Sequence, residues 1–207
     1  MAEHTIITAR NISKSFGSNH VLNDLSFEVE RGIVLGIEGE NGSGKSTLLN
    51  ILARYWKADS GSLVINGRIG FCPQSPMLFV HLTVEENLSF FKQAYGMGKN
   101  RVTDHRIARL DELLRTFNFP EPLSKKCSKL SGGTLQKLNL IIALMNDPDI
   151  LLLDEPYASF DWETYLSFWK FSENLRNEGK TLIIISHIIY AREKLDRIWT
   201  LRRGKLV

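Results

Sequence analysis

Short apolar runs recur along the chain and predict strands of two kinds. Three of them are apolar almost without interruption, at 32–39, 149–154 and 181–186. Uninterrupted runs of this length are typical of strands that are buried on both faces of a sheet. The segment 21–30 instead alternates apolar with polar residues, which predicts a strand with one solvent-exposed face. Shorter strand-like pieces follow at 62–66 and 70–74.

Five longer segments have the apolar spacing of one helical face and predict helices. They cover 46–57, 83–95, 105–119, 131–145 and a segment that begins near Asp161. In the first of them, Leu48, Leu52 and Tyr55 share a face. The second opens with Thr83 and, three residues later, Glu86, which is the pattern of a capping box.

The order of these elements predicts an α/β fold. Buried strands that alternate with helices form mainly parallel sheets with both faces covered. The middle of the chain departs from this alternation, because it is rich in helices from about residue 80 to 140. We therefore expect a sheet-based core that is interrupted by a helical insert.

Composition and charge exclude several classes of protein. Of the 207 residues, 43% are hydrophobic and 24% are charged, as in ordinary globular domains and unlike disordered or collagen-like chains. The 26 basic and 23 acidic side chains leave a net charge of +3. An excess this small does not indicate binding to nucleic acid or to an anionic membrane.

The sequence contains no signal for export or for crossing a membrane. The N-terminal MAEHTIITARN has an acid at Glu3 and lacks the apolar core of a signal peptide. The most apolar runs, 138–145 and 181–190, are shorter than the roughly 18 residues that indicate a spanning helix. Cys72 and Cys127 have no metal-ligand spacing, and we expect two free thiols in a reducing compartment.

The segment from Gly39 to Thr47 reads GENGSGKST and matches the phosphate-binding loop pattern G-x-x-x-x-G-K-[ST]. It lies between a predicted strand and a predicted helix, the context in which such loops bind nucleotides. Glycines let the backbone N–H groups surround a phosphate, and the helix N-terminus adds partial positive charge. Lys45 is expected at the β- and γ-phosphates, with the Ser46 hydroxyl on Mg²⁺. The expected nucleotide-binding residues here are Gly39, Asn41, Gly42, Ser43, Gly44, Lys45, Ser46 and Thr47.

Two acids end the apolar run LLLDE at 151–155. The carboxyl end of a parallel strand lies beside the phosphate loop, which places Asp154 near the Mg²⁺ ion. Glu155 alternates to another direction and is a candidate to polarise an attacking water. By itself this pattern is equally that of an ordinary strand end, and the phosphate loop is what favours the catalytic interpretation.

The segment 130–134, LSGGT, precedes a long apolar helix. Two interpretations are open from the residues alone. It is a second anion-binding helix start, or Ser131 is a simple N-cap followed by flexible glycines.

Taken in order, these motifs resemble the ATP-binding subunit of ABC transporters, and the resemblance covers essentially the whole chain. Phe16 resembles the aromatic residue that stacks on adenine, Gln74 the Q-loop glutamine, and 130–134 the signature motif. Asp161 resembles the D-loop aspartate and His187 the switch histidine. Departures are Thr134 and Lys137 in the signature and Tyr157, Ala158 and Phe160 in the D-loop.

The resemblance implies a fold in more detail. It implies a P-loop NTPase core with a mainly parallel sheet, an N-terminal antiparallel β subdomain and a helical insert. The single domain would cover 1–207, with a RecA-like core at about 1–79 and 147–207 and a helical subdomain at about 80–146.

The resemblance also implies hydrolysis of ATP with Mg²⁺ in a head-to-tail dimer. Ser131, Gly132 and Gly133 of one subunit would contact the nucleotide of the other. Its implied catalytic residues are Lys45, Glu155 and His187, and its implied Mg²⁺ residues are Ser46, Gln74 and Asp154.

The implied partners are a second ATPase subunit, identical or different, and transmembrane permease subunits. The chain would then be cytoplasmic and peripheral on the inner face of the cell membrane, without direct contact to nucleic acid. A soluble ATPase acting on nucleic acid or ribosomes and a non-hydrolysing regulatory module are the alternative functions.

For three positions, the sequence leaves a second interpretation open. Phe16 and His187 are also plausible core residues, and 77–80 is either core or an exposed groove for a helix of the membrane subunit.

Overall fold

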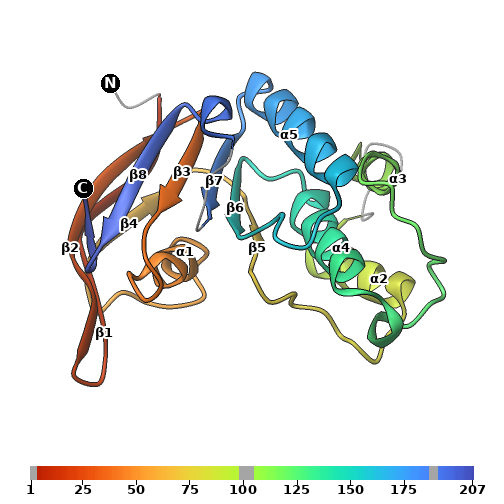
Figure 1. Cartoon of the computed structure of the whole chain (residues 1–207), viewed down its shortest axis with the longest axis horizontal. Coiled ribbons are helices and arrows are strands. Elements are labelled where there is room, and N and C mark those ends of the chain that lie inside the picture. The colour runs from red at the N-terminus through yellow and green to blue at the C-terminus, as the bar shows by residue number, and fades with distance from the viewer. Residues whose placement is uncertain (1–3, 98–104, 187–190) are drawn as a thin grey trace.

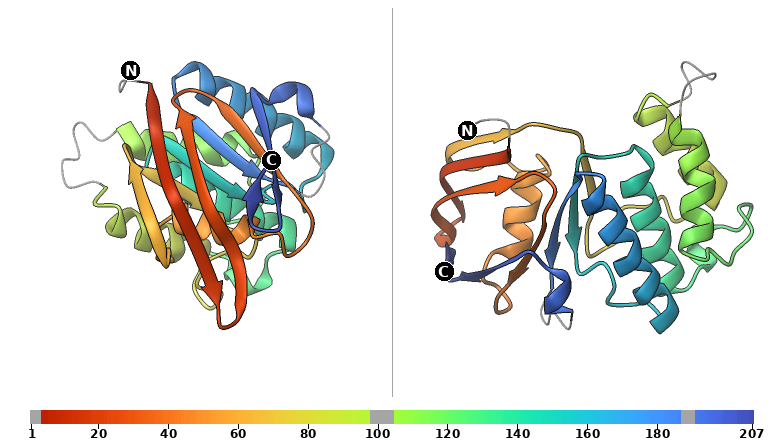
Figure 2. Two further views of the ribbon diagram at one scale, coloured as in Figure 1. Left: turned by 90° about the vertical axis from the view of Figure 1, so that its left-hand side faces the viewer. Right: turned by 90° about the horizontal axis from the view of Figure 1, so that it is seen from above.

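The computed structural model describes residues 4–97, 105–186 and 191–207. Over these ranges the chain forms two sheets and a group of helices (Figure 1). The sheets lie side by side, and most of the helices gather on the far side of the second sheet (Figure 2). The expected α/β class is confirmed.

The first sheet is antiparallel and has three strands in the order β2-β1-β4. Its strands are β1 (Thr5–Phe16), β2 (Asn19–Glu30) and β4 (Ser60–Ile65). In β2, Leu25, Phe27 and Val29 are buried while the residues between them are exposed, as the alternation predicted. One face of this sheet therefore covers the core and the other meets solvent.

The second sheet has the strand order β5-β6-β7-β3-β8-β9 and is parallel from β5 to β8. β9 pairs antiparallel with β8. Its strands are β3 (Val34–Glu38), β5 (Ile69–Cys72), β6 (Ile150–Asp154), β7 (Thr181–Ile185), β8 (Arg197–Arg202) and β9 (Lys205–Leu206). The predicted mainly parallel sheet and antiparallel β subdomain are both present.

Each central strand serves two hydrophobic cores, which explains why its sequence is apolar throughout. In β6, Ile150 and Leu152 pack into the core between the two sheets. Leu151 and Leu153 pack into the core between the second sheet and the helices. A strand with both faces covered has no position for a polar residue until it ends.

Helix α1 (Lys45–Leu52) lies between the two sheets and belongs to the first of these cores (Figure 2). The prediction that the helix continues to residue 57 was wrong. Arg54 has a left-handed backbone with φ 63°, and the Tyr55 and Trp56 amides both turn back to the Asn50 carbonyl. Tyr55 is consequently exposed rather than part of the helical face.

The remaining helices cover the other face of the second sheet (Figure 1). They are α2 (Val84–Ala94), α3 (His105–Thr116), α4 (Gly132–Met145) and α5 (Trp162–Asn177), with short 3₁₀ turns at Cys127–Lys129 and Arg192–Lys194. Helix α4 is buried from Gln136 to Met145, because α3 packs on one side of it and β5 on another. A helix in such a central position is expected to be mostly apolar, and the buried polar residues Lys137 and Asn139 are paired.

The capping box at the start of α2 is confirmed and allows a stability prediction. The Thr83 hydroxyl accepts a hydrogen bond from the Glu86 amide at 3.1 Å, and the Thr83 amide donates to the Glu86 carboxylate at 2.7 Å. We expect Thr83→Ala to lower the free energy of unfolding by about 1 kcal/mol, because one amide loses its acceptor. Urea unfolding measures this, and Thr83→Ser, which keeps the hydroxyl, should retain most of the stability. Equal stability of the alanine variant and the parent would contradict the prediction.

Among the described residues, no helix is both long enough and apolar enough to span a bilayer. Cys72 and Cys127 are free thiols, as expected from their spacing, and both are buried.

Candidate functional site

The phosphate loop connects β3 to α1, and its glycines are required by its shape. Gly42 and Gly44 have φ of 77° and 105°, and residues that carry a Cβ atom rarely adopt such values. A Cβ on Gly44 would lie 2.8 Å from the Leu22 side chain, and one on Gly39 would lie 2.2 Å from the Leu201 carbonyl. The loop therefore packs closely against both β2 and β8, and these contacts fix its position.

Lys45, the first residue of α1, is almost fully buried at the base of this loop. Its ammonium donates to the carbonyls of Gly39 at 2.7 Å and Glu40 at 2.9 Å. Burial lowers the pKa of Lys45, and the nearby carboxylates of Glu155 and Asp154 oppose this shift. The positive charge is therefore held under the loop, close to both acids.

Ser43 gives an independent indication of what the loop binds. Its side chain is buried, and its hydroxyl has no hydrogen-bond partner among the described residues. A buried polar group without a partner is costly, so an acceptor at this point would stabilise the site. Phosphate oxygens are acceptors, and the donor set of the loop therefore fits a phosphate group.

Asp154 and Glu155 lie at the end of β6. In the sheet, one strand, β7, separates β6 from β3. Asp154 is buried, whereas Glu155 leaves the strand with a left-handed backbone of φ 51°. The Glu155 amide donates to the Ile185 carbonyl at 3.0 Å, which holds this turn. A left-handed conformation outside glycine costs about 1–3 kcal/mol and concentrates at functional sites.

A cavity of about 320 Å³ brings most of the predicted residues together. Its walls include ten of them: Phe16, Asn41, Gly42, Gly44, Lys45, Ser46, Thr47, Gln74, Asp154 and Glu155. Gly39 and Ser43 belong to the same loop without lining the cavity.

Phe16 is not a core residue. It is 46% exposed and meets Trp56 edge-on at a centroid distance of 5.3 Å. An exposed ring at the mouth of this cavity is available for stacking.

Three residues that no sequence pattern singled out also line the cavity: Asn19, Val21 and Ile185. Val21 and Ile185 have an ordinary strand pattern, and nothing in that pattern marks them. Val21 reaches the cavity from β2 of the first sheet and Ile185 from the end of β7 in the second, and only the tertiary structure brings them together.

Gln74 reaches the cavity from the chain that leaves β5. The Asn139 amide of α4 donates to the Pro73 carbonyl at 2.9 Å and to the Cys72 sulfur at 3.2 Å. The helix that follows the signature motif therefore fixes the position of the chain just before Gln74. His187 lies outside the described residues.

The signature segment does not line this cavity in the part of the chain that the structure describes. Ser131 is the N-cap of α4, and its hydroxyl accepts from the Thr134 amide at 3.2 Å. Ser131 and Gly132 are exposed to solvent. The simple N-cap interpretation is therefore correct as a local structure, and the exposed helix start also remains open to a ligand from outside the chain.

The signature and the D-loop contact one another. A Cβ on Gly133 would lie only 2.7 Å from the Ser159 carbonyl, so glycine permits this close approach. Lys137 of α4 pairs with Asp161 at 3.2 Å. Asp161 caps α5 and accepts from the Thr164 amide at 2.8 Å, and these bonds lower the pKa of Asp161 to about 2.

Comparisons with known proteins agree with this site. The family model described as ABC transporter matches residues 22–158. The chain is 34% identical to the uncharacterized ABC transporter ATP-binding protein MJ1023 of Methanocaldococcus jannaschii over 97% of the chain and 76% of that protein. It is 29% identical to ABC transporter G family member 20 of Dictyostelium discoideum, of which it spans only 29%.

Solved structures give the same result. A structure described as the ATP binding subunit of an ABC transporter has a TM-score of 0.88 and 26% identity over 97% of this chain and 88% of that one. The dimeric bacterial ABC transporter cassette MJ0796 has a TM-score of 0.85 and 27% identity over 97% and 96%. The phosphate loop, the acid pair and these likenesses together show that the chain belongs to the ABC transporter family, as an ATP-binding subunit with ATPase activity.

Proposed function

We propose that this chain hydrolyses MgATP in a head-to-tail dimer and thereby drives transport through separate membrane subunits. One observation carries the proposal: the phosphate loop and both acids share a cavity that the chain's own signature segment does not line. A second subunit, turned head to tail, would supply the missing signature. Dimeric assembly of the cassette MJ0796 supports this arrangement.

Different residues of the cavity would bind different parts of the nucleotide. Phe16 would stack on the adenine, while the loop amides and Lys45 would hold the phosphates. Asp154, Ser46 and Gln74 supply the oxygen ligands that Mg²⁺ prefers. When bound, the ion would neutralise charge on the phosphates.

Glu155 is the proposed general base. It lines the cavity beside Lys45 and Asp154, and it is the only one of the two acids that is not fully buried. Its carboxylate would accept a proton from the water that attacks the γ-phosphate. His187 is proposed, from the resemblance of its motif, to assist at the same phosphate.

The partner's contribution would come from Ser131, Gly132 and Gly133. The exposed start of α4 directs backbone N–H groups outward, which suits a phosphate held by the other subunit. Because Lys137 ties α4 to Asp161, the signature and the D-loop would approach the partner as one unit. Thr134 in the signature leaves both a homodimer and a heterodimer with unequal sites open.

An exposed apolar patch supports a membrane partner. Met77, Phe79, Val80 and Phe90 are each between 44% and 48% exposed, and Phe79 contacts Phe90 at a ring distance of 4.6 Å. They follow Gln74 along the chain and lie at the start of the helical insert. The exposure of Met77, Phe79 and Val80 favours a surface position for 77–80 over the core interpretation, although Leu78 packs against the core.

We place the chain in the cytoplasm, on the inner face of the membrane, with permease subunits bound at this apolar patch. A net charge of +3 gives no reason to add nucleic acid as a partner. The division into a RecA-like core (about 1–79 and 147–207) and a helical subdomain (about 80–146) is part of the same proposal, and the succession of α2, α3 and α4 without an intervening strand supports it.

Co-purification from the native host tests this function. The tagged Glu155→Gln variant is extracted from membranes in mild detergent with MgATP, and the proteins that accompany it are identified. A multi-spanning protein is the expected partner. Ribosomal or DNA-associated proteins without any membrane protein would instead indicate a soluble ATPase and contradict the transport proposal.

A further inference from the structure

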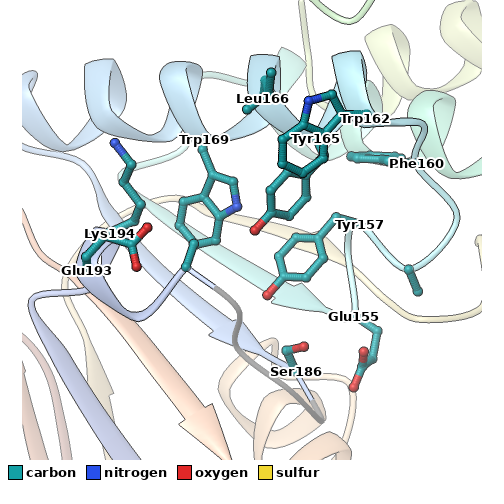
Figure 3. Close-up of a pocket in the computed structure, with 12 residues that line it drawn as sticks. Glu155, Tyr157, Phe160, Trp162, Tyr165, Leu166, Trp169, Ser186, Glu193 and Lys194 are labelled. Carbon is teal, nitrogen blue, oxygen red and sulfur yellow. The ribbon is translucent and has the colours of Figure 1, made fainter.

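A second and larger cavity, of about 800 Å³, lies beside the nucleotide site (Figure 3). Three segments line it: the turn after Glu155, the first two turns of α5, and the chain at Ser186 and 191–194. Its size falls in the range of cavities that hold drug-sized ligands. None of the functions assigned above uses it.

Aromatic rings form one wall of this cavity. Tyr157 and Tyr165 meet at a centroid distance of 5.4 Å, and Tyr157 lies 5.9 Å from Trp169. Trp162 stacks on Tyr165 with an interplanar angle of 17° and is nevertheless 71% exposed. Leaving a large ring in water is unfavourable, so a wall of this kind is suited to a planar apolar ligand.

Trp169 carries an unused hydrogen-bond donor in the same wall. Its side chain is 5% exposed, and its Nε1–H has no partner among the described residues. Figure 3 shows the indole nitrogen on the side of the ring that faces the two tyrosines. Buried indole N–H groups are normally paired, so this donor indicates an acceptor on whatever occupies the cavity.

The charges at the cavity favour a positive ligand. Glu193 contributes an exposed carboxylate to its lining, next to Trp169 in Figure 3, whereas the Glu155 carboxylate already lies near the Lys45 ammonium. The one ammonium of the lining, on Lys194, is directed to Glu173 at 4.0 Å. Ring faces attract cations as well, so rings and carboxylates act in the same direction.

We propose that this cavity binds a planar organic cation that carries a hydrogen-bond acceptor. The cation stacks against Tyr157 and Trp162, its acceptor receives the Trp169 Nε1–H, and Glu193 supplies the opposite charge. Because Glu155 lines both cavities, the occupant also changes the rate of ATP hydrolysis. This last consequence rests on the proposed role of Glu155, whereas binding itself does not.

Berberine is a suitable probe, because it is planar, permanently cationic, carries ether oxygens and becomes fluorescent in apolar sites. We expect saturable 1:1 binding to the full chain without nucleotide. Trp169→Phe, which keeps a ring but removes the donor, should weaken binding about tenfold. Glu193→Gln and Trp162→Ala should each weaken it about fivefold. Trp162 and Glu193 are exposed, so these two variants test the site without disturbing the core.

Matched controls separate this site from the rest of the protein. Trp199→Phe, at a ring on β8, and Glu178→Gln, at the far end of α5, should bind berberine like the parent. Lys45→Ala should also bind it unchanged, so a failure of the proposed ATP site does not affect this result. Absence of saturable binding, displacement of the dye by ATP, or equal binding by the parent and all three cavity variants would overturn the proposal.

Discussion

We expect Glu155→Gln to bind MgATP with unchanged affinity and to lose about 10²- to 10⁴-fold in turnover, the usual contribution of a general base. Glutamine preserves the size of the side chain and its position after β6. Its amide cannot accept the proton of the attacking water. A phosphate-release assay gives kcat, and equilibrium titration with MgATP gives the affinity.

The same variant should accumulate as a dimer in the presence of MgATP. If hydrolysis is what reopens the two subunits, blocking it leaves the closed form populated. Light scattering after chromatography, with MgATP and with MgADP, measures this directly. Glu178→Gln, a carboxylate exposed at the other end of α5, is the control and should hydrolyse ATP normally.

Two results would contradict these assignments. Hydrolysis at the parental rate would show that Glu155 is not the base. A dimer that forms equally with MgADP would show that the γ-phosphate does not control closure, and the head-to-tail proposal would lose its mechanism.

Much of the fold is predictable from the sequence because local patterns and tertiary packing agree. The apolar runs at 149–154 and 181–186 became β6 and β7, each with residues in both hydrophobic cores. The capping box at Thr83 formed as expected. In each case a short-range pattern has the same consequence in any well-packed α/β protein.

The errors arose where tertiary contacts decide the outcome. The apolar spacing of 46–57 continues past Leu52, yet the turn at Arg54 ends the helix and exposes Tyr55. Periodicity does not contain information about where such a turn forms. Strand β1 depends on tertiary contacts in the same way: it extends over Thr5–Phe16, although only residues 5–8 are strongly apolar, because β2 and β4 pair with it on both sides.

In the candidate site, too, some residues were predictable from the sequence and others were not. The phosphate loop and the acid pair were predictable, because each has a spacing that its chemistry requires. Asn19 and the aromatic cavity at Tyr157 were not, since their residues are brought together from separate segments without a shared motif. An unusual D-loop composition was the one sequence signal for that cavity.

Lys45→Ala should weaken ATP binding by about 10- to 100-fold. The ammonium is held by the Gly39 and Glu40 carbonyls next to the two acids, where it can turn to a phosphate oxygen. A hydrogen bond to a charged group contributes about 1.5–3 kcal/mol, which corresponds to this range of affinity. Titration with a fluorescent ATP analogue measures the loss.

The fold itself should tolerate this change, which makes the result interpretable. Burial lowers the pKa of Lys45, so the folded protein holds this charge at a cost that the alanine variant does not have. The loss of its two hydrogen bonds to carbonyls opposes this gain, and we expect Tm to shift by no more than about 4 °C. Lys45→Met, which keeps the aliphatic stem, should lose ATP affinity to the same extent. Unchanged affinity in both variants would mean that the loop does not bind the phosphates, whereas a large fall in Tm of both would mean that Lys45 holds the loop rather than the nucleotide.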